Sequence, residues 1–312
     1  MKAHRVVFMG TPDFAVPCLQ ALVDAGYEVC GVVSQPDRPK GRGRKLTPSP
    51  VKEAALKLNL PVVTVERVKE PAFLAQMKEW NPDVAVVVAF GQILPESVLK
   101  TPVFGCINVH ASLLPAYRGA APIHRAIING ESETGVTTMQ MDKGMDTGGM
   151  LLSQRVAIGP DMNVGELHDV LSRCGAALIA KTLDGLFAGE LTPVPQDESR
   201  ATYAPMLDRS LERIDWRKTA RELHNLVRGL NPWPGAYCIC DSIPMKVWRT
   251  RTKPTGGLLK PGRIHACGNE GVLVETGEGL LELLEIQPES KRRMSARECA
   301  CGYCLLPGTV LE

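Results

Sequence analysis

Short apolar segments alternate with helix-like stretches through the first third of the chain, and this alternation restricts the possible folds more than any other feature. The apolar segments are Arg5–Gly10, Val29–Ser34, Val62–Val65, Val84–Phe90 and Cys106–Val109. The stretches between them that favour helices are about Phe14–Ala25, Pro50–Leu58 and Pro71–Trp80. Strands that are apolar on both faces are typical of parallel sheets covered by helices on both sides. The pattern therefore predicts an α/β fold with a mostly parallel sheet.

The chain changes character after Gly189. Its length of 312 residues exceeds the usual size of one hydrophobic core, so two domains are expected. The polar, Pro-rich segment Leu191–Glu198 is typical of a connector. Short strand-like segments with Gly-rich turns follow it, and these favour a small barrel. We therefore expect an N-terminal domain at 1–190, a linker at 191–207 and a C-terminal barrel domain at 208–312.

The composition is that of an ordinary globular protein, with 44% hydrophobic residues, 22% charged residues and a formal net charge of +2. This net charge excludes a strongly basic chain but is compatible with a local basic patch. The longest apolar run, Val84–Phe90, is too short to cross a membrane, and the N-terminal run is too short for a signal peptide. We therefore expect a cytoplasmic protein without a membrane partner.

The chain contains ten cysteines, which raises the question of disulfides or a metal. In a cytosolic chain of this size, free buried thiols are the simplest expectation. Cys299, Cys301 and Cys304 form the densest group, but they supply only one C-x-x-C pair, whereas a zinc site needs four placed ligands. No metal is therefore expected, and the role of this group stays open.

An amide and an imidazole lie two residues apart at the end of the fifth apolar segment. Because strand side chains alternate between faces, Asn108 and His110 would share one face. The segment Ser112–Pro115 is expected to be a loop, since its proline has no N–H to continue a helix. Asp146 lies in a second expected loop, the Gly- and Asp-rich segment Met141–Gly149. Sheets of this class carry their ligand sites in such loops.

These three side chains suit acyl-type transfer to an amine. An attacking amine must lose a proton, and histidine is the side chain tuned for this near neutral pH. An asparagine amide can donate to the oxyanion of a tetrahedral intermediate, and a carboxylate can orient the imidazole. No serine or cysteine lies in a recognisable nucleophile elbow, which favours direct transfer over a covalent intermediate. The spacing is equally compatible with a capping asparagine and a hydrogen-bonded core histidine.

The phosphate-binding motifs of nucleotide enzymes are missing from the start of the chain. The first apolar segment ends at Gly10-Thr11-Pro12, but neither a G-x-G-x-x-G nor a Gly-Lys-Ser/Thr loop follows. A proline at position 12 also lacks the N–H that a phosphate-binding turn would need there. The sequence therefore disfavours binding of NAD or ATP.

A basic segment at 35–46 concentrates positive charge on Arg38, Lys40, Arg42, Arg44 and Lys45. Its two prolines and two glycines predict neither helix nor strand. A flexible basic loop is suited to gripping a nucleic-acid backbone, although charge runs are also common in solvated surface loops. Trp233 and Trp248, in the second domain, could stack bases or lie in a core. We favour a phosphate-binding role for the basic segment.

Taken together, these motifs resemble the family of methionyl-tRNA formyltransferases over nearly the whole chain. The resemblance is carried by Gly10–Phe14, Gln35–Pro39, Gly41–Gly43, Pro48–Lys52, Asn108–His110, Ser112–Pro115, Arg118–Ile123, Gly135–Thr137, Met139–Asp142, Asp146–Gly148 and Asn231–Pro234. The Ser-Leu-Leu-Pro segment and the Asp-x-Gly-x-Asp-Thr-Gly loop are similar to those of folate-dependent formyltransferases in general. The basic Arg-Gly segment, Ile214–Trp216 and Asn231–Pro234 resemble the tRNA enzymes within that group.

The resemblance implies a Rossmann-like catalytic domain followed by a small OB-like barrel domain. It implies transfer of a formyl group from 10-formyltetrahydrofolate, a co-substrate, to the α-amino group of methionyl initiator tRNA. The product would be the N-formylmethionyl-tRNA that serves translation initiation. A monomer is expected, with initiator methionyl-tRNA and folate as its partners.

The resemblance also implies roles for individual residues. It assigns catalysis to Asn108, His110 and Asp146, with either of the last two as the proximate base. It assigns folate contacts to Phe90, Gly91, Gln92, Ile93, Leu94, Ser112, Leu113, Leu114, Pro115 and Asp142. It assigns contacts with the tRNA acceptor stem to Arg38, Lys40, Arg42, Arg44 and Lys45.

Two alternatives stay open from the sequence. One is a formyltransferase that acts on a small amine, such as an amino-sugar nucleotide or glycinamide ribonucleotide. The basic segment and the second domain argue against it, because a small substrate needs neither. The other is a tRNA-binding protein without catalysis, which the intact set of Asn108, His110 and Asp146 disfavours.

The chain departs from the family pattern at Ala111, where a glycine is common.

Overall fold

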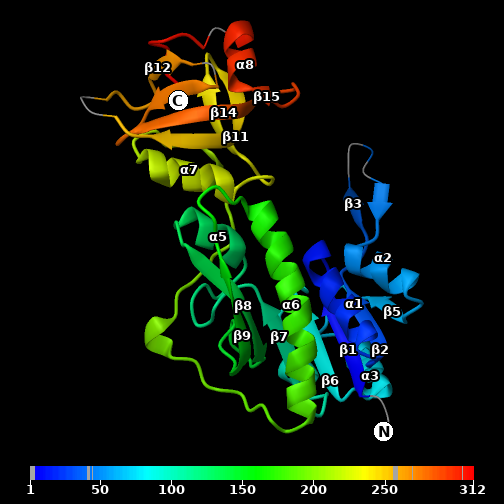
Figure 1. Ribbon diagram of the computed structural model, residues 1–312. Helices are drawn as coiled ribbons and strands as arrows, with labels where there is room; N and C mark the ends of the chain where they lie inside the picture. The colour runs from blue at the N-terminus through cyan, green and yellow to red at the C-terminus, as the bar shows by residue number, and fades with distance from the viewer. Residues whose placement is uncertain (1–3, 41–42, 44, 256–258, 269, 304) are drawn as a thin grey trace. The chain divides into compact units, whose positions relative to one another are not determined.

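The computed structural model describes all of the chain except residues 1–3, 41–42, 44, 256–258, 269 and 304. The chain divides into two compact units. Unit 1 comprises Met1–Gly119, Glu133–Ala157 and His168–Ala204, and unit 2 comprises Ala120–Ser132, Ile158–Leu167 and Pro205–Glu312. Each unit thus draws on separate stretches of sequence, and the domain boundaries expected at 190 and 208 stay predictions. Figure 1 shows the elements of both units.

Unit 1 is built on a sheet of seven strands in the order β5-β2-β1-β6-β7-β8-β9. The strands are β1 (Arg5–Gly10), β2 (Glu28–Ser34), β5 (Val62–Thr64), β6 (Val84–Val88), β7 (Cys106–His110), β8 (Glu133–Gln140) and β9 (Met150–Ala157). The first five are mutually parallel, whereas β8 and β9 run antiparallel to their neighbours. The predicted mostly parallel α/β sheet is therefore confirmed. Strand β6 stops two residues earlier than predicted, because Ala89 (φ 45°) and Gly91 (φ 85°) turn the backbone.

Helices cover both faces of this sheet. They are α1 (Val16–Asp24), α2 (Pro50–Lys57), α3 (Pro71–Trp80), α4 (Glu96–Leu99) and α6 (Val164–Phe187), with a 3₁₀ turn η1 at Asp13–Ala15. Phe73 and Met77 of α3 pack in one core cluster with Cys106 of β7. Val109 of β7 faces the other way, and a Cβ placed on Gly175 of α6 would lie 3.0 Å from it. The apolar strands are thus buried on both sides, as their composition indicated.

The basic segment 35–46 corrects one prediction. It forms a hairpin of two short antiparallel strands, β3 (Arg38–Lys40) and β4 (Lys45–Thr47), where neither helix nor strand was expected. Pro39 is tolerated because each strand of a two-stranded hairpin keeps one unpaired edge, so its missing N–H need not break the ladder. Arg42 and Arg44 lie outside the described residues, and so does the side chain of Lys40.

Unit 2 contains an antiparallel sheet in the order β10-β11-β14-β13-β12, with β15 paired to β14. Its strands are β10 (Ala236–Cys240), β11 (Ile243–Lys253), β12 (Ile264–Cys267), β13 (Val272–Glu275), β14 (Leu280–Pro288) and β15 (Met294–Ser295). Its helical elements are α5 (Pro122–Ile128), η3 (Arg209–Glu212), α7 (Ala220–Gly229) and α8 (Ala296–Tyr303). A capping box of Thr219 and Glu222 begins α7. Helices α5 and α8 were not predicted.

The last residues of the chain bridge the two edges of this sheet. Glu312 and Ile239 of β10 exchange backbone hydrogen bonds of 2.8 and 2.9 Å. At the other edge, Ile264 of β12 donates to the carbonyl of Thr309, and Leu311 donates to that of Gly262, each at 2.8 Å. The sheet is thereby closed on itself through residues 309–312, which supports the expected barrel-like form.

Tryptophans and cysteines divide between core and surface. Trp248 is 5% exposed and lies under the guanidinium of Arg293, whereas Trp233 is 67% exposed. Cys238, Cys240 and Cys299 are buried free thiols, while the side chain of Cys301 and all of Cys304 lie outside the described residues.

In the part of the chain that the structure describes, no helix is both long and apolar enough to span a bilayer.

A buried carboxylate anchors the end of β13. Glu275 is fully buried and accepts hydrogen bonds from Arg263, from the backbone N–H of Lys260 and from His265. The hydrogen bonds from Arg263 are the main cause that lowers the pKa of this carboxyl to about 2. Because the pKa of Glu275 is depressed in the folded state, this carboxylate stabilises the fold at pH values above the ordinary pKa of a glutamate. The effect is lost as the pH falls towards about 2.

We expect Glu275→Gln to lower the free energy of unfolding at neutral pH by about 2 kcal/mol, because charged hydrogen bonds are lost. The difference between the parent and the variant should shrink as the pH falls below about 5. Urea unfolding at several pH values measures both effects. Glu278→Gln, at an exposed glutamate nearby, is the control. A difference that is independent of pH would contradict the assignment.

Candidate active site

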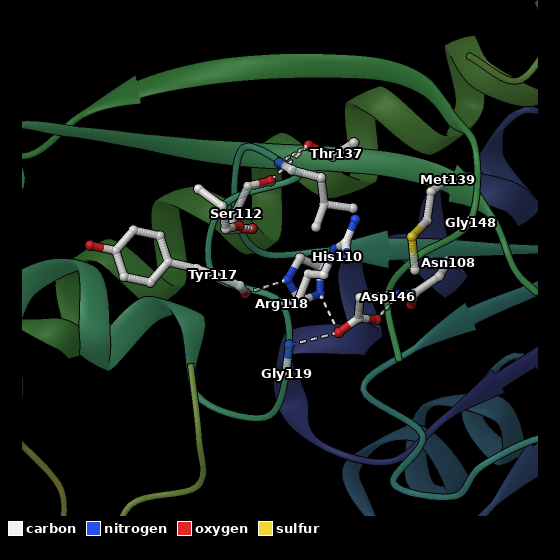
Figure 2. A network of polar contacts seen from close by, with 12 residues as sticks. Asn108, His110, Ser112, Tyr117, Arg118, Gly119, Thr137, Met139, Asp146 and Gly148 are labelled. Atoms are coloured by element: carbon white, nitrogen blue, oxygen red, sulfur yellow. Dashed lines mark hydrogen bonds and ion pairs between the residues drawn. The ribbon is translucent and has the colours of Figure 1, made fainter. Parts of the chain in front are cut away.

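Asn108 and His110 lie at the carboxyl end of β7, where the sheet changes from parallel to antiparallel pairing. Their positions alternate with Val109, so both side chains lie on the same face, as predicted. They are 9% and 6% exposed. Across the ladder, Asn108 is paired with Met139 and His110 with Thr137 of β8. Figure 2 shows these side chains together with that of Asp146.

The histidine ring is held through one nitrogen. Its Nε2 lies 2.9 Å from the carbonyl oxygen of Tyr117. Because a carbonyl only accepts, Nε2 carries the hydrogen and donates it. In neutral His110 the lone pair is therefore on Nδ1, which lies 3.7 Å from Oδ2 of Asp146. The free lone pair and the carboxylate thus lie on the same side of the ring (Figure 2).

Asp146 has an unusual backbone conformation, and its carboxylate is held by contacts with Gly119 and Asn108. Its φ of 53° is left-handed, a conformation that aspartate tolerates better than most residues. Oδ2 accepts a hydrogen bond of 2.8 Å from the N–H of Gly119, and Oδ1 lies 3.5 Å from Nδ2 of Asn108. The structure therefore brings together the three predicted residues, although Asn108 and Asp146 are 38 positions apart in the chain.

The loop Ser112–Pro115 forms a tight turn beside the histidine. Ser112 Oγ donates to the carbonyl of Ala116 at 2.6 Å, and its own carbonyl accepts from Thr137 Oγ1 at 2.7 Å. The N–H of Leu114 donates to the same threonine oxygen at 3.1 Å. Ser112, Leu114 and Pro115 are buried and Leu113 is half-buried. This loop therefore offers mainly backbone and the side chain of Leu113 to a ligand.

The second group of predicted folate contacts, Phe90–Leu94, contains both buried and exposed side chains. Phe90 and Leu94 are buried, whereas Ile93 is 77% exposed. The amide of Gln92 donates to the carbonyl of Val65 and accepts from the N–H of Val68, each at 3.0 Å. Gly91 has a φ of 85°. Gln92 and Gly91 therefore shape this loop, and Ile93 is the apolar side chain that it presents.

A cavity of about 590 Å³ lies in unit 1 against α4. Its wall contains Leu99 of α4 and the segment Gln140–Lys143, and so includes Asp142 among the predicted folate contacts. Asp142 also shapes the loop, since Oδ1 accepts from the N–H of Gly144 at 2.9 Å and from Thr147 Oγ1 at 2.6 Å. Among the described residues, no group of three or more His, Cys, Asp or Glu side chains is arranged to hold a metal ion.

The predicted tRNA contacts are only partly described. Arg38 and Lys45 are exposed on the hairpin of β3 and β4. The one acid of this segment, Asp37, is paired with Lys52 of α2 at 2.8 Å. The described hairpin therefore presents positive charge that Asp37 does not neutralise.

Sequence reasoning missed a buried arginine and its partners. Arg118 is 1% exposed, and its guanidinium donates to Oε1 of Gln196 and to both carboxylate oxygens of Glu198. The hydrogen bond from Arg118 is the main cause that lowers the pKa of Glu198. Gln196 and Glu198 lie in the segment predicted to be a linker, and no local pattern indicates a contact with a residue 78 positions earlier. The available signal in the sequence was the Arg118-Gly119 pair after the Ser-Leu-Leu-Pro loop, which belongs to the segments shared with the family.

Gly119 is required by the site geometry. Its φ is 116°, and an added Cβ would lie 2.9 Å from the carbonyl oxygen of Ala204. We expect Gly119→Ala to lower the free energy of unfolding by about 2–3 kcal/mol, because strain and a backbone clash combine. Gly189→Ala is the matched control, since Gly189 has a φ of 72° but open space around it. That control should lose about 1 kcal/mol in urea unfolding, and equal losses would argue against a clash at Gly119.

Comparisons with known proteins agree with this geometry. The family model described as formyl transferase matches residues 4–183, and the model for the formyl transferase C-terminal domain matches residues 206–304. Methionyl-tRNA formyltransferase of Geobacter metallireducens is 51% identical over 99% of this chain and 98% of its own length. That of Clostridioides difficile is 48% identical over 98% of this chain and 99% of its own.

Solved structures share the fold at lower identity. The sugar 3N-formyl transferase WlaRD, solved with dTDP and 5-N-formyl-THF, superposes with a TM-score of 0.67 at 19% identity, covering 94% of this chain and all of its own. The N-formyltransferase of Helicobacter canadensis gives 0.67 at 18% identity, covering 92% of this chain and 100% of its own. The matches to the family models and the relatives of about half identity over the full length show that the chain belongs to the formyltransferase family, among the methionyl-tRNA formyltransferases.

Proposed function

We propose that the chain transfers the formyl group of 10-formyltetrahydrofolate to the α-amino group of methionyl initiator tRNA, with Asn108, His110 and Asp146 as its catalytic groups. The observation that carries this proposal is the convergence of these three side chains at the end of β7. Membership of the methionyl-tRNA formyltransferases supports folate and tRNA as the two substrates. The product is the N-formylmethionyl-tRNA used to initiate translation.

His110 is positioned to receive the proton of the attacking amine. Since Nε2 donates to the carbonyl of Tyr117, only Nδ1 can accept a proton. The carboxylate of Asp146 lies 3.7 Å from Nδ1 and would stabilise the imidazolium that results. A proton on Nδ1 can then return to the leaving nitrogen of the folate or pass to Asp146. Either group fits as the proximate base.

Asn108 is the candidate donor to the developing oxyanion. Among the described residues, its Nδ2 has one polar contact, of 3.5 Å to Oδ1 of Asp146, which is at the outer limit of a hydrogen bond. This amide is therefore available for a stronger acceptor when the amine adds to the formyl carbon. A donor that is already fixed on a strand needs no reorganisation in the transition state.

Folate binding is proposed along the two loops beside the trio. The exposed Ile93 and the half-buried Leu113 would supply apolar contact. Asp142 would contribute from the loop that follows β8. The other predicted contacts, Phe90, Gly91, Gln92, Leu94, Ser112, Leu114 and Pro115, would act through their backbone or by shaping these loops.

The hairpin of β3 and β4 is the proposed grip on the tRNA acceptor stem. Arg38 and Lys45 lie on it in exposed positions, with Lys40, Arg42 and Arg44 between them in the sequence. Neutralising several phosphates would make binding strongly dependent on salt. A monomer in the cytoplasm completes the proposal, because one copy of unit 1 contains the whole trio and charged initiator tRNA is used in that compartment.

The direct test incubates the protein with 10-formyltetrahydrofolate and methionyl initiator tRNA and measures formylmethionine after mild base hydrolysis of the ester. Rapid formylation supports the proposal. Absence of formylation, together with formylation of an amino-sugar nucleotide or glycinamide ribonucleotide in parallel reactions, would favour a transferase for small amines. Absence of formylation on every acceptor, with tRNA still bound, would favour a binding protein.

We expect Asn108→Ala and His110→Ala each to lower kcat by roughly 10²–10³-fold, from the usual contributions of an oxyanion donor and a general base. The KM values for both substrates should change little. His168→Ala, at a histidine that pairs with Asp13 and Asp169, is the control for loss of an imidazole in unit 1. Near-normal turnover in both site variants would rule out the proposed mechanism.

We expect Arg42→Ala to raise the KM for tRNA by several-fold and to leave folate affinity unchanged, because one phosphate contact is lost. The slope of log affinity against log salt should fall by about one unit. Arg67→Ala removes the same charge from an exposed arginine of unit 1 and serves as the control. A loss of folate affinity in Arg42→Ala would show that the basic hairpin has another role.

A further inference from the structure

The loop that bears Asp146 connects β8 and β9 and has to hold its carboxylate near Nδ1 of His110. The side chain contributes one strong hydrogen bond, from the N–H of Gly119. The backbone of Asp146 is in the left-handed region, which few residues adopt without support. The position of this carboxylate therefore depends on what holds the backbone on either side of it.

One amide holds that backbone. Nε2 of Gln196 donates to the carbonyl of Asp146 and to the carbonyl of Gly148, each at 2.8 Å. The two hydrogens of a carboxamide match these two acceptors. Gln196 thus binds two carbonyls of the loop between β8 and β9, and one of them is the carbonyl of Asp146 itself.

The other end of the same amide is held by a buried cation. Oε1 of Gln196 accepts from Nε and Nη2 of Arg118 at 3.1 and 2.8 Å. The backbone of Arg118 is itself bonded on both sides, to the carbonyl of Thr202 at 2.9 Å and to the N–H of Ala204 at 2.7 Å. Arg118 also lies between Tyr117 and Gly119, whose backbone groups hold His110 and Asp146 (Figure 2).

We infer that Gln196 is a positioning residue for Asp146 and that Arg118 anchors it. The inference rests on the catalytic role proposed for Asp146 and goes beyond it, because it assigns a function to a side chain in the segment after α6. Gln196 fixes the loop through its two N–H donors, and Arg118 fixes the orientation of the amide by binding its oxygen. The alternative is that Gln196 contributes to stability alone.

Two substitutions of Gln196 test whether it positions Asp146 or contributes to stability alone. Gln196→Met keeps a side chain of similar length and removes both donors and the acceptor. Gln196→Glu keeps the acceptor for Arg118 and removes the donors, so it places a carboxylate against two carbonyl oxygens. We expect both to lower kcat by roughly 10–100-fold, the usual effect of displacing a catalytic group by about 1 Å. The KM for folate and for tRNA should change less than about threefold, since neither substrate touches Gln196 in the proposed arrangement.

Thr182→Val is the matched control for the loss of a buried hydrogen bond. Thr182 is fully buried in unit 1, where its hydroxyl contacts Thr138 Oγ1 and the carbonyl of Leu178. Valine has the same shape, so the variant should unfold at lower urea concentration and keep its kcat. A purely structural role for Gln196 would make its variants behave like this control.

The deciding experiment is a double-mutant cycle with Asp146→Ala in the full chain. If Gln196 acts through Asp146, Gln196→Met should change kcat less than about twofold once Asp146 is alanine, because the group that it positions is gone. Multiplicative effects of the two substitutions would overturn the inference. If Asp146→Ala alone left kcat unchanged, the proposed role of Asp146 would fail, whereas an effect of Asp146→Ala without one of Gln196→Met would remove only the inference.

Hydrogen exchange supplies a readout that does not depend on turnover. Gln196→Met should speed amide exchange in residues 141–149 selectively, with little change in β6 or β7. This result is expected even if the variant is less stable than the parent. Uniformly faster exchange over unit 1, or no change in the loop, would contradict a local tether.

Discussion

The backbone at Tyr117–Gly119 is the constraint on which the site depends. Within three residues it supplies a carbonyl to His110 and an N–H to Asp146, so it fixes the ring and the carboxylate against each other. The φ values of 60° at Tyr117 and 116° at Gly119 make this turn costly in isolation. The buried guanidinium of Arg118 and its contacts with Gln196 and Glu198 hold it. The geometry of the proposed catalytic site thus depends on backbone groups of this turn, which orient the side chains of His110 and Asp146.

The sheet of unit 1 was predictable because its strands are buried on both faces. Continuous apolar runs identified β1, β2, β6 and β7 to within a few residues. Strand β9 escaped detection, since most of its residues are partly or fully exposed and no apolar run marks it. The hairpin of β3 and β4 was wrongly predicted to be a loop, because prolines exclude central strands but are tolerated at the edges of a two-stranded ribbon.

The proposed catalytic trio of Asn108, His110 and Asp146 was partly predictable from sequence for a related reason. Asn108 and His110 are neighbours on one strand, so the alternation of a strand was enough to place them together. Asp146 was a candidate as an acid in a Gly-rich loop, and the resemblance to a known family assigned it to the same site; in the structure its Oδ2 lies 3.7 Å from Nδ1 of His110. Gln196 could not be found in this way. Its partners lie about 50 and 78 residues earlier in the chain, and a polar segment with two prolines looks like a connector in isolation.

The tether of Asp146 also has a chemical property that a carboxylate or a histidine in its place would lack. An amide does not titrate, and the hydrogen bonds from Arg118 to Glu198 raise the pKa of that guanidinium and lower that of its partner. In the proposed mechanism a proton moves through His110 and Asp146, while Gln196 and Arg118, which hold the loop, keep their charge. In the proposed mechanism, the residues that carry the proton are therefore distinct from those that keep the distances, so charge shifts in the cleft while Gln196 and Arg118 keep theirs.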